Sequence, residues 1–212
     1  MGKPAGLATK QLRALDRLRR VQALSGFYLA GGTAVAFHLG HRRSLDLDLF
    51  SLKGDADLLA VQRSLTRLRG SVEVLGVTEA TVKLKFLGES LDVVRYPYAP
   101  LETPQPGPSG FPIAGLLDLA VMKLAAIARR GIRRDFWDLY AITRAGVPLA
   151  RAGNAYLQRY GVRESDLYFV VRSLTYFDDA EKDPVLPEGL TRARWTTIRR
   201  FFATEAPKLL HP

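Results

Sequence analysis

The chain contains no cysteine and only three histidines, which are His38, His41 and His211. The absence of cysteine excludes disulfide bonds, thiolate zinc sites and a cysteine nucleophile. Long apolar runs are also missing, since no stretch approaches the roughly 18 residues that a membrane-spanning helix needs. The opening residues, MGKPAGLATK, lack the continuous apolar core of a secretory signal. We therefore expect a cytoplasmic protein with no membrane partner.

The 212 residues have the composition of a globular protein, with 47% hydrophobic and 25% charged side chains. This length is enough for one large domain or two small ones. The formal net charge is +10, and arginine supplies most of the positive charge. Such a charge favours a nucleotide or a nucleic acid as partner, because both are polyanions. The alternative, a small basic protein that binds no polyanion, stays open on charge alone.

The first half of the chain alternates helix and strand patterns. Apolar residues at helical spacing predict a helix over 7–24, and the period-two pattern of LDLDLF predicts a strand over 45–50. The other expected elements are a strand over 27–31, a helix over 33–40, a helix around 55–69, and strands within 71–77, 80–87 and 90–96.

A proline-rich segment over 96–112, YPYAPLETPQPGPSGFP, reads as a linker or a long surface connection. Everything after it has helical periodicity. The expected helices cover 113–130, 133–145, 148–158, 163–176 and 190–204. We therefore predict an α+β fold, in which a small mixed-sheet domain over 1–105 precedes a helical domain over 106–212. The cleft between two such domains is the default ligand site, so the helical domain is expected to contribute to it.

Two aspartates, Asp46 and Asp48, interrupt the leucines of the strand LDLDLF. Side chains at i and i+2 of a strand point to the same face, so both carboxylates share one side. Mg²⁺ prefers oxygen ligands and is usually held by one or two carboxylates together with substrate phosphates. Without a cation the two carboxylates repel each other. The plainer alternative is a half-exposed strand whose polar face meets water.

Two neighbouring features favour the metal site. The run SLDVV predicts another strand and offers Asp92 as a third carboxylate. Upstream, Gly31 and Gly32 allow a ligand to approach the backbone closely, and a helix that starts near Thr33 directs its N–H groups at a phosphate. A phosphate cradle beside clustered carboxylates is what nucleotidyl transfer requires.

Lys123 is the one charged residue between Leu119 and Ala128, and its helical face is otherwise apolar. A buried ammonium is costly unless it finds an anion, and a bound triphosphate is one candidate. The alternative is that its long stem reaches the surface. Asp135 and Asp138 follow on the next helix, where either supports the same site or pairs locally.

Arginines occur at two further places of interest. Arg43 lies directly before the aspartates, in HRRS, and is placed to meet a phosphate-bearing substrate. The segment RARWTTIRRFF, over 192–202, combines arginines with aromatic residues and offers a surface for RNA. An ordinary amphipathic helix, with its aromatic residues in the core, explains that segment slightly better.

The segment FYLAGGTAVAFHLGHRRSLDLDLF resembles the signature of the AbiEii/AbiGii toxin-like nucleotidyltransferases, within the DNA polymerase β-like superfamily. The shared pattern is a Gly-Gly at a helix start, then D-x-D on the next strand, then a further aspartate on a later strand. The segment MKLAAIARRGIRRDFWDLY resembles a second block of the family, which has a lysine followed by R-D-x-x-D. The resemblance covers roughly residues 26–142.

This resemblance implies an enzyme that uses Mg²⁺, or Mn²⁺ in its place, and an NTP donor. It implies that Asp46, Asp48 and Asp92 bind metal and take part in catalysis, and that Lys123 contacts the nucleotide and also takes part in catalysis. It further implies a tRNA 3′ end as acceptor in some relatives, and a toxin with an antitoxin partner. The expected nucleotide-binding residues are Gly31, Gly32, Thr33, Arg43, Lys123, Asp135 and Asp138.

Two alternatives of other classes stay open. One is a nucleotide- or RNA-binding module that keeps the fold without turnover, which we expect if Asp92 lies far from Asp46 and Asp48. The other is a metal-dependent nuclease, which also uses clustered carboxylates but needs no triphosphate cradle.

Overall fold

The computed structural model describes residues 6–68, 72–182 and 186–210. The chain divides into two compact units, Met1–Gly115 and Leu116–Pro212. The first unit is built on a mixed sheet and the second is helical, so the predicted α+β fold is confirmed. The boundary falls at residue 115, whereas the sequence suggested residue 105.

Within its described residues, the first unit contains a seven-stranded sheet in the order β3-β4-β5-β2-β1-β7-β6. Strands β2 and β5 pair in parallel, as do β1 and β7, and the other neighbours are antiparallel. The strands are β1 (Phe27–Leu29), β2 (Asp46–Ser51), β3 (Val72–Val77), β4 (Thr81–Phe86), β5 (Glu89–Val94), β6 (Gln105–Pro106) and β7 (Pro112–Ile113).

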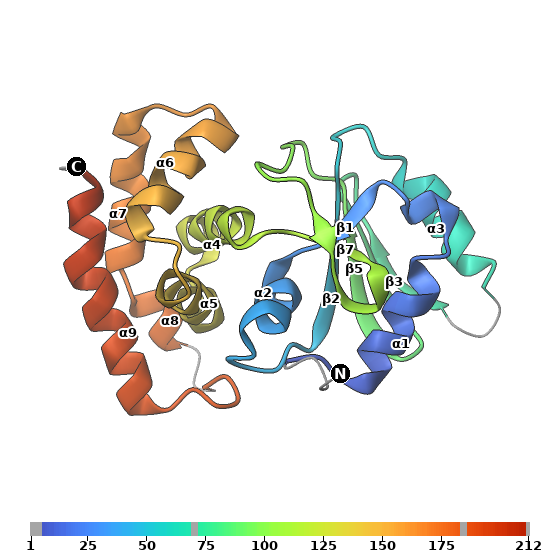
Figure 1. Ribbon diagram of the computed structural model, residues 1–212, viewed down its shortest axis with the longest axis horizontal. Coiled ribbons are helices and arrows are strands. Elements are labelled where there is room, and N and C mark those ends of the chain that lie inside the picture. The colour runs from blue at the N-terminus through green and yellow to red at the C-terminus, as the bar shows by residue number, and fades with distance from the viewer. Residues whose placement is uncertain (1–5, 69–71, 183–185, 211–212) are drawn as a thin grey trace. The chain divides into compact units, whose positions relative to one another are not determined.

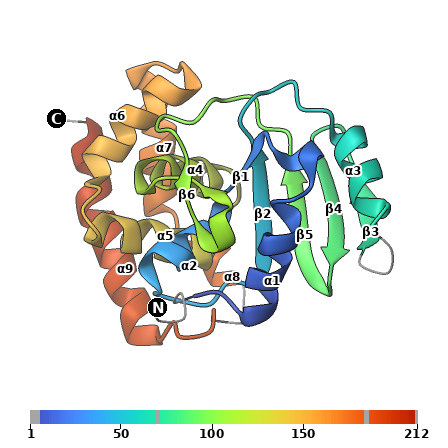
Figure 2. The same cartoon turned by 45° about the vertical axis from the view of Figure 1, so that its right-hand side comes forward.

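Helices cover the two faces of this sheet unequally (Figure 1). Helix α2 (Gly31–Leu39) lies on one face, and α1 (Thr9–Leu18) and α3 (Leu58–Thr66) lie on the other. Figure 2 shows α1 in front of the central strands, with β2, β5 and β4 side by side. The buried leucines and valines of these strands form the core on the side of α1 and α3: Leu47, Leu49, Val82, Leu84, Leu91 and Val93.

Three predicted elements of the first unit differ from the observed ones. The helix expected over 7–24 ends at Leu18, and a short 3₁₀ turn, η1 (Gln22–Leu24), follows it. The strand expected over 27–31 stops at Leu29, because Gly31 already begins helix α2. The helix expected around 55–69 is shorter, since Asp57 caps α3 by accepting a hydrogen bond from the Ala60 N–H.

The proline-rich segment 96–112 is more than a connection. Its residues form β6, the 3₁₀ turn η2 (Pro108–Gly110) and the start of β7. The backbone of β7 extends the sheet, with Ile113 aligned against Leu29 of β1 and Gln105 of β6 aligned against Ile113. Both strands are two residues long; β6 is the edge strand, where proline is tolerated, and β7 lies between β6 and β1. This edge hairpin belongs to the first unit and explains why its boundary falls later than predicted.

The second unit is helical throughout its described residues. Helix α4 packs against α5, α6 and α7. The chain here forms α4 (Leu116–Arg130), α5 (Arg133–Arg144), α6 (Leu149–Tyr160), η3 (Glu164–Asp166), α7 (Leu167–Thr175), α8 (Asp178–Lys182), α9 (Arg192–Glu205) and η4 (Ala206–Leu210). The short helix α8 was not predicted. In the described part of the chain, no helix has the length and hydropathy to cross a membrane.

Aromatic side chains and a buried pair of Arg159 with Asp118 help to hold this helical unit together. Phe136 of α5 lies with its ring centroid 5.4 to 5.9 Å from the rings of Phe177, Trp195 and Phe202. Arg159 of α6 donates to the buried Asp118 carboxylate of α4 at 2.7 Å. Because Trp195 is buried in this cluster, α9 behaves as the amphipathic helix that the sequence favoured.

Candidate active site

The N-terminus of α2 lies against the carboxylate of Asp48. Gly31, the first residue of this helix, has φ of +61°, a conformation that glycine adopts at little cost. A Cβ atom at this position would overlap the Asp48 carboxylate group. The glycine therefore serves two purposes: it makes the sharp turn from β1 into α2, and it leaves room for Asp48.

The hydroxyl of Thr33 anchors the helix start to strand β2. Thr33 is fully buried, and its Oγ1 donates to the backbone carbonyl of Asp46. The hydroxyl of Ser44 lies 2.6 Å from that of Thr33 and also bonds the same carbonyl. In this structure the Thr33 side chain thus positions the strand that carries the aspartates. That Thr33 and Gly32 contact a phosphate stays a prediction.

The first turn of α2 nevertheless has the properties of an anion site. The first N–H groups of any α-helix have no partner inside the helix, and the helix dipole places partial positive charge there. Residues Gly31, Gly32 and Thr33 form this turn. A phosphate bound at this turn stays a prediction.

Strand pairing brings Asp92 beside Asp48. Strands β2 and β5 run parallel, with Asp48 aligned to Asp92 and Asp46 aligned to Ser90. Aligned residues of neighbouring strands point to the same face, and neighbouring strands lie about 4.8 Å apart. Asp46, Asp48 and Asp92 therefore share one face of the sheet, which we call the carboxylate face. All three side chains are partly exposed, while the leucines between them are buried.

A lysine that the sequence analysis did not single out also lies on the carboxylate face. Lys83 of β4 is aligned with Asp92, and its Nζ donates to Asp92 Oδ2 at 2.8 Å. The hydrogen bond and the charge of Asp92 raise the pKa of Lys83 above its usual value, and the charges of Asp48 and Asp46 add to this rise. The charges of all three aspartates therefore favour the charged form of this one ammonium.

The carboxylate face offers the oxygen ligands that a divalent metal such as Mg²⁺ prefers. Across the described segments, no group of three or more aspartate, glutamate, histidine or cysteine side chains is arranged to hold a metal ion. Mg²⁺, however, is commonly bound by one or two carboxylates plus substrate phosphates. Asp46 and Asp48 supply such a pair on one side of β2, beside the α2 N-terminus. The donor chemistry therefore fits Mg²⁺ or Mn²⁺, with Asp92 engaged by Lys83 in this structure.

Lys123 occupies the interior of the second unit. Only 6% of its side chain is exposed, and its Nζ lies 2.8 Å from Asp135 and 2.7 Å from Asp138. Burial alone would lower the pKa of Lys123, but the charges of Asp138 and Asp135 outweigh this effect and raise it. The anion expected for this ammonium is thus provided by the chain itself, and its contact with a nucleotide stays a prediction.

Arg130, whose side chain is 58% exposed, contacts this buried group from the surface. Its guanidinium donates to both carboxylate oxygens of Asp135, at 2.8 and 3.1 Å. Burial raises the pKa of Asp135, but the charge of Lys123 and the hydrogen bond and charge of Arg130 outweigh it and lower that pKa. We call Lys123, Arg130, Asp135 and Asp138 the buried charge cluster. It joins α4 to α5.

Arg43, the remaining predicted nucleotide-binding residue, lies in the exposed loop before β2. Its carbonyl accepts a hydrogen bond from Arg42. The structure therefore leaves its side chain at the surface of the first unit, and its contact with a nucleotide also stays a prediction.

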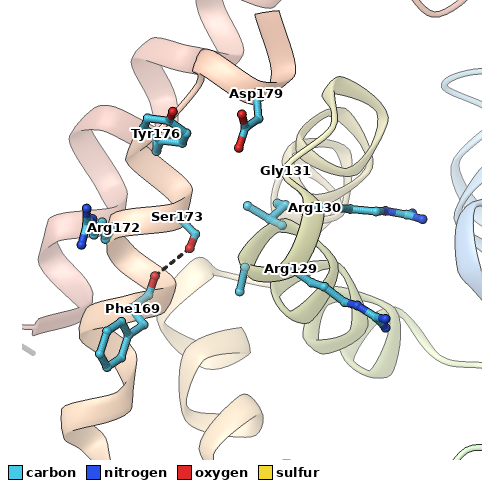
Figure 3. A pocket seen from close by; sticks show the side chains of 10 residues that line it. Arg129, Arg130, Gly131, Phe169, Arg172, Ser173, Tyr176 and Asp179 are labelled. Atoms are coloured by element: carbon cyan, nitrogen blue, oxygen red, sulfur yellow. Dashed lines mark hydrogen bonds between the residues drawn. The ribbon is translucent and has the colours of Figure 1, made fainter. Parts of the chain in front are cut away.

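A separate pocket of about 340 Å³ lies in the second unit, between the end of α4 and helices α7 and α8 (Figure 3). Ser173 faces this space and donates to the Phe169 carbonyl, while the carboxylate of Asp179 points toward it. Arg129 and Arg130 extend away from α7. This arrangement provides no convergent set of cations for an anion.

Comparison with known proteins places the chain among toxins. Residues 13–210 match the family model of the nucleotidyl transferase AbiEii toxin of type IV toxin–antitoxin systems. The chain belongs to this family. The match confirms the resemblance that the two sequence segments predicted, and it extends over nearly the whole chain. An AbiEii-family protein is a nucleotidyltransferase of the toxin type.

The chain is also similar to another protein in sequence and to several solved structures in fold. The chain is 32% identical over 207 residues to the uncharacterised protein aq_aa25 of Aquifex aeolicus, covering 96% of this chain and 98% of that protein. The MenT4 nucleotidyltransferase toxin of Mycobacterium tuberculosis has a similar fold, with TM-score 0.60 and 18% identity over 92% of this chain and 82% of that one.

Two further folds are similar. JHP933 of Helicobacter pylori matches with TM-score 0.54 and 17% identity over 95% of this chain and 90% of that one. The antibiotic-resistance factor ANT(2'')-Ia matches with TM-score 0.53 and 14% identity over 76% of this chain and 98% of that one. At these identities the likeness concerns the fold. The AbiEii-family assignment itself rests on the family model.

Proposed function

We propose that the protein transfers a nucleoside monophosphate from an NTP to an acceptor hydroxyl in a metal-dependent reaction. The acceptor we favour is a tRNA 3′ end, and the proposed role is that of the toxin in a toxin–antitoxin pair that acts in the cytoplasm. The observation that carries the proposal is the alignment of Asp48 with Asp92, beside Asp46 and the N-terminus of α2.

In the proposed reaction, the acceptor oxygen forms a bond to the α-phosphorus while the bond from this phosphorus to the bridging oxygen breaks and pyrophosphate leaves. Asp46 and Asp48 would hold Mg²⁺, or Mn²⁺ in its place. The bound metal would neutralise the triphosphate and activate the attacking hydroxyl. Asp92 would accept the proton of that hydroxyl, and the first turn of α2 would donate its N–H groups to the phosphates.

The side chains of this chain have distinct tasks in the proposal. Gly31 keeps the helix start close to Asp48, and Thr33 fixes the strand position of Asp46. Arg43, on the exposed loop before β2, would meet the phosphates of the donor or the acceptor. The family resemblance further implies a nucleotide contact for Lys123, with Asp135 and Asp138 in support.

The test is incubation with each of the four α-labelled NTPs, Mg²⁺ and total tRNA. The variants are the double variant Asp46→Ala, Asp48→Ala and the control Asp55→Asn, which changes an exposed aspartate outside the carboxylate face. We expect label in RNA with the wild type and the control, from one preferred NTP. A loss of at least a hundredfold is expected for the double variant, the size found when a transition-state contact is removed.

The outcomes separate the alternatives. NTP binding with no transfer to RNA, protein or small acceptors would contradict the enzyme and favour the binding module. Shortening of the RNA without NTP would favour the nuclease. Label in protein or in a small molecule alone would keep the transferase and replace the acceptor. Co-purification with a neighbouring gene product that suppresses transfer would support an antitoxin partner.

A further inference from the structure

Lys83 belongs to the same row of the sheet as two of the aspartates. Register aligns Lys83 of β4 with Asp92 of β5, and Asp92 with Asp48 of β2. Aligned side chains lie on one face, and two strand spacings separate Lys83 from Asp48, roughly 9 to 10 Å between backbones. A lysine side chain spans much of that distance. The positive charge of the ammonium can therefore act on all three carboxylates of the carboxylate face.

Charge explains why a cation is needed at this position. Three carboxylates on one face repel one another unless a positive charge lies among them. Lys83 contacts Asp92 directly at 2.8 Å. The next lysine of the strand, Lys85, points to the same side but is aligned with Ser90 and pairs with Glu73 of β3 at 3.5 Å. Lys83 is thus the lysine of β4 that neutralises the carboxylate face.

The contact is built to be exchangeable. The Lys83 side chain is 60% exposed and that of Asp92 is 30% exposed. Exposed ion pairs contribute little to folding, typically below about 1 kcal/mol. Lysine also carries its charge on a flexible stem as a compact ammonium that forms no fixed bidentate geometry. A pair of this kind can open without disturbing the strands that support it.

We propose that Lys83 is an exchangeable counter-cation of the carboxylate face. It neutralises the aspartates when no metal–nucleotide complex is bound. With the complex bound, Asp46 and Asp48 would hold the metal, and the Lys83 ammonium would leave Asp92 and donate to the phosphate oxygens of the nucleotide. This inference rests on the proposed function and adds a residue for nucleotide positioning that the sequence motifs do not contain.

The proposal requires two opposite effects of one substitution. In Lys83→Met the stem remains and the charge is lost. Metal alone should bind the variant more tightly, because no ammonium on the carboxylate face repels a cation at Asp46 and Asp48. The metal–nucleotide complex should bind more weakly, because a phosphate contact is missing. A lysine that only supported the strand would shift neither affinity, or would weaken both together.

The experiment measures both affinities on the full chain. Free Mn²⁺ is titrated by electron paramagnetic resonance without nucleotide, and a non-cleavable α,β-methylene NTP is titrated calorimetrically with Mg²⁺. For Lys83→Met we expect Mn²⁺ binding about two- to fivefold tighter and nucleotide binding roughly tenfold weaker. The matched control, Lys85→Met, should leave both values unchanged. Lys83→Arg should keep most of the nucleotide affinity.

The two affinities, together with label transfer by the wild type, distinguish the role of Lys83 from the proposed reaction. Unchanged or weaker Mn²⁺ binding by Lys83→Met, or unchanged nucleotide binding, would overturn the counter-cation. Opposite shifts without any label transfer by the wild type would support Lys83 while contradicting the proposed reaction. Transfer by the wild type without opposite shifts would contradict Lys83 alone. A wild type that binds no Mn²⁺ would contradict both.

Discussion

Two groups of lysine and aspartate side chains, one in each unit, use the same chemistry in opposite surroundings. On the carboxylate face, Lys83 is mostly exposed and bonds one carboxylate. In the buried charge cluster, Lys123 is almost fully buried and bonds two. Burial makes the second group an integral part of the helical fold, because an unpaired charge there is costly. Exposure leaves the first group free to exchange partners.

Lysine–aspartate pairing alone does not mark a ligand site. The pairs of the buried charge cluster satisfy one another inside the unit, and Arg130 covers Asp135 from the side. On the carboxylate face the three acids are partly exposed, so a cation from solvent can reach them. Differences in folding energy and in metal binding should therefore separate the two groups.

The largest expected effect is on the buried charge cluster. Replacing Lys123 by methionine leaves Asp135 and Asp138 buried next to each other without their shared cation. We expect a loss of about 3 to 5 kcal/mol in the free energy of unfolding, measured by urea denaturation. Restoring neutrality with Asp135→Asn and Asp138→Asn in the same chain should recover part of that loss. A Lys123→Met protein as stable as the wild type would contradict the structural role.

A smaller effect is expected where the helix start meets the carboxylate face. Gly31→Ala places a Cβ atom where the Asp48 carboxylate lies and strains a backbone with positive φ. We expect a loss of about 1 to 2 kcal/mol in stability and a displaced Asp48, with Mn²⁺ binding weakened at least fivefold. Gly26→Ala is the matched control, since its position is open and close in sequence. Equal Mn²⁺ binding by both variants would contradict the contact.

The pH dependence of folding should reveal the contribution of Asp135 in the buried charge cluster. The pKa of Asp135 is lower in the folded state than its ordinary value of 3.8. Its ionised form therefore stabilises the fold above that value, and this contribution is lost as pH falls through the folded-state pKa. We expect the unfolding free energy to drop on acidification below about pH 4, measured by urea titrations at stepped pH. An equally steep drop in Asp135→Asn would assign it to other carboxylates.

The smallest expected effect on folding is that of Lys83→Met. Its ion pair is exposed, so the unfolding free energy should change by less than about 1 kcal/mol. The same urea titration used for Lys123→Met measures it. A loss as large as that of Lys123→Met would make Lys83 a structural residue and remove the contrast between the two groups.

The sequence predicts those parts of the site that depend on local pattern. Asp46 and Asp48 can be predicted as site residues because alternation within one strand places them on one face. The glycines indicate where the next helix starts. Asp92 was a candidate, but its place beside Asp48 depends on pairing between strands that are far apart in the sequence. Lys83 was overlooked, because a lysine on a strand with an exposed face is ordinary until its register is known.

The buried charge cluster shows another limit. The apolar neighbours of Lys123 correctly indicate burial and the need for an anion. They do not indicate that Asp135 and Asp138, on the following helix, supply it, because this depends on the angle between α4 and α5. Likewise the prolines of segment 96–112 suggest a linker, while their short strands β6 and β7 depend on an available sheet edge next to β1.

The most direct test of the carboxylate face as the active site is the transfer of labelled nucleotide by Asp48→Asn, expressed per folded molecule. Asparagine keeps the size of the side chain and removes the charge that faces both the α2 N-terminus and Asp92. We expect the rate of transfer to fall at least a hundredfold. Urea denaturation should show that the variant is still folded. Transfer at the wild-type rate by a folded Asp48→Asn protein would contradict the claim that the carboxylate face is the active site.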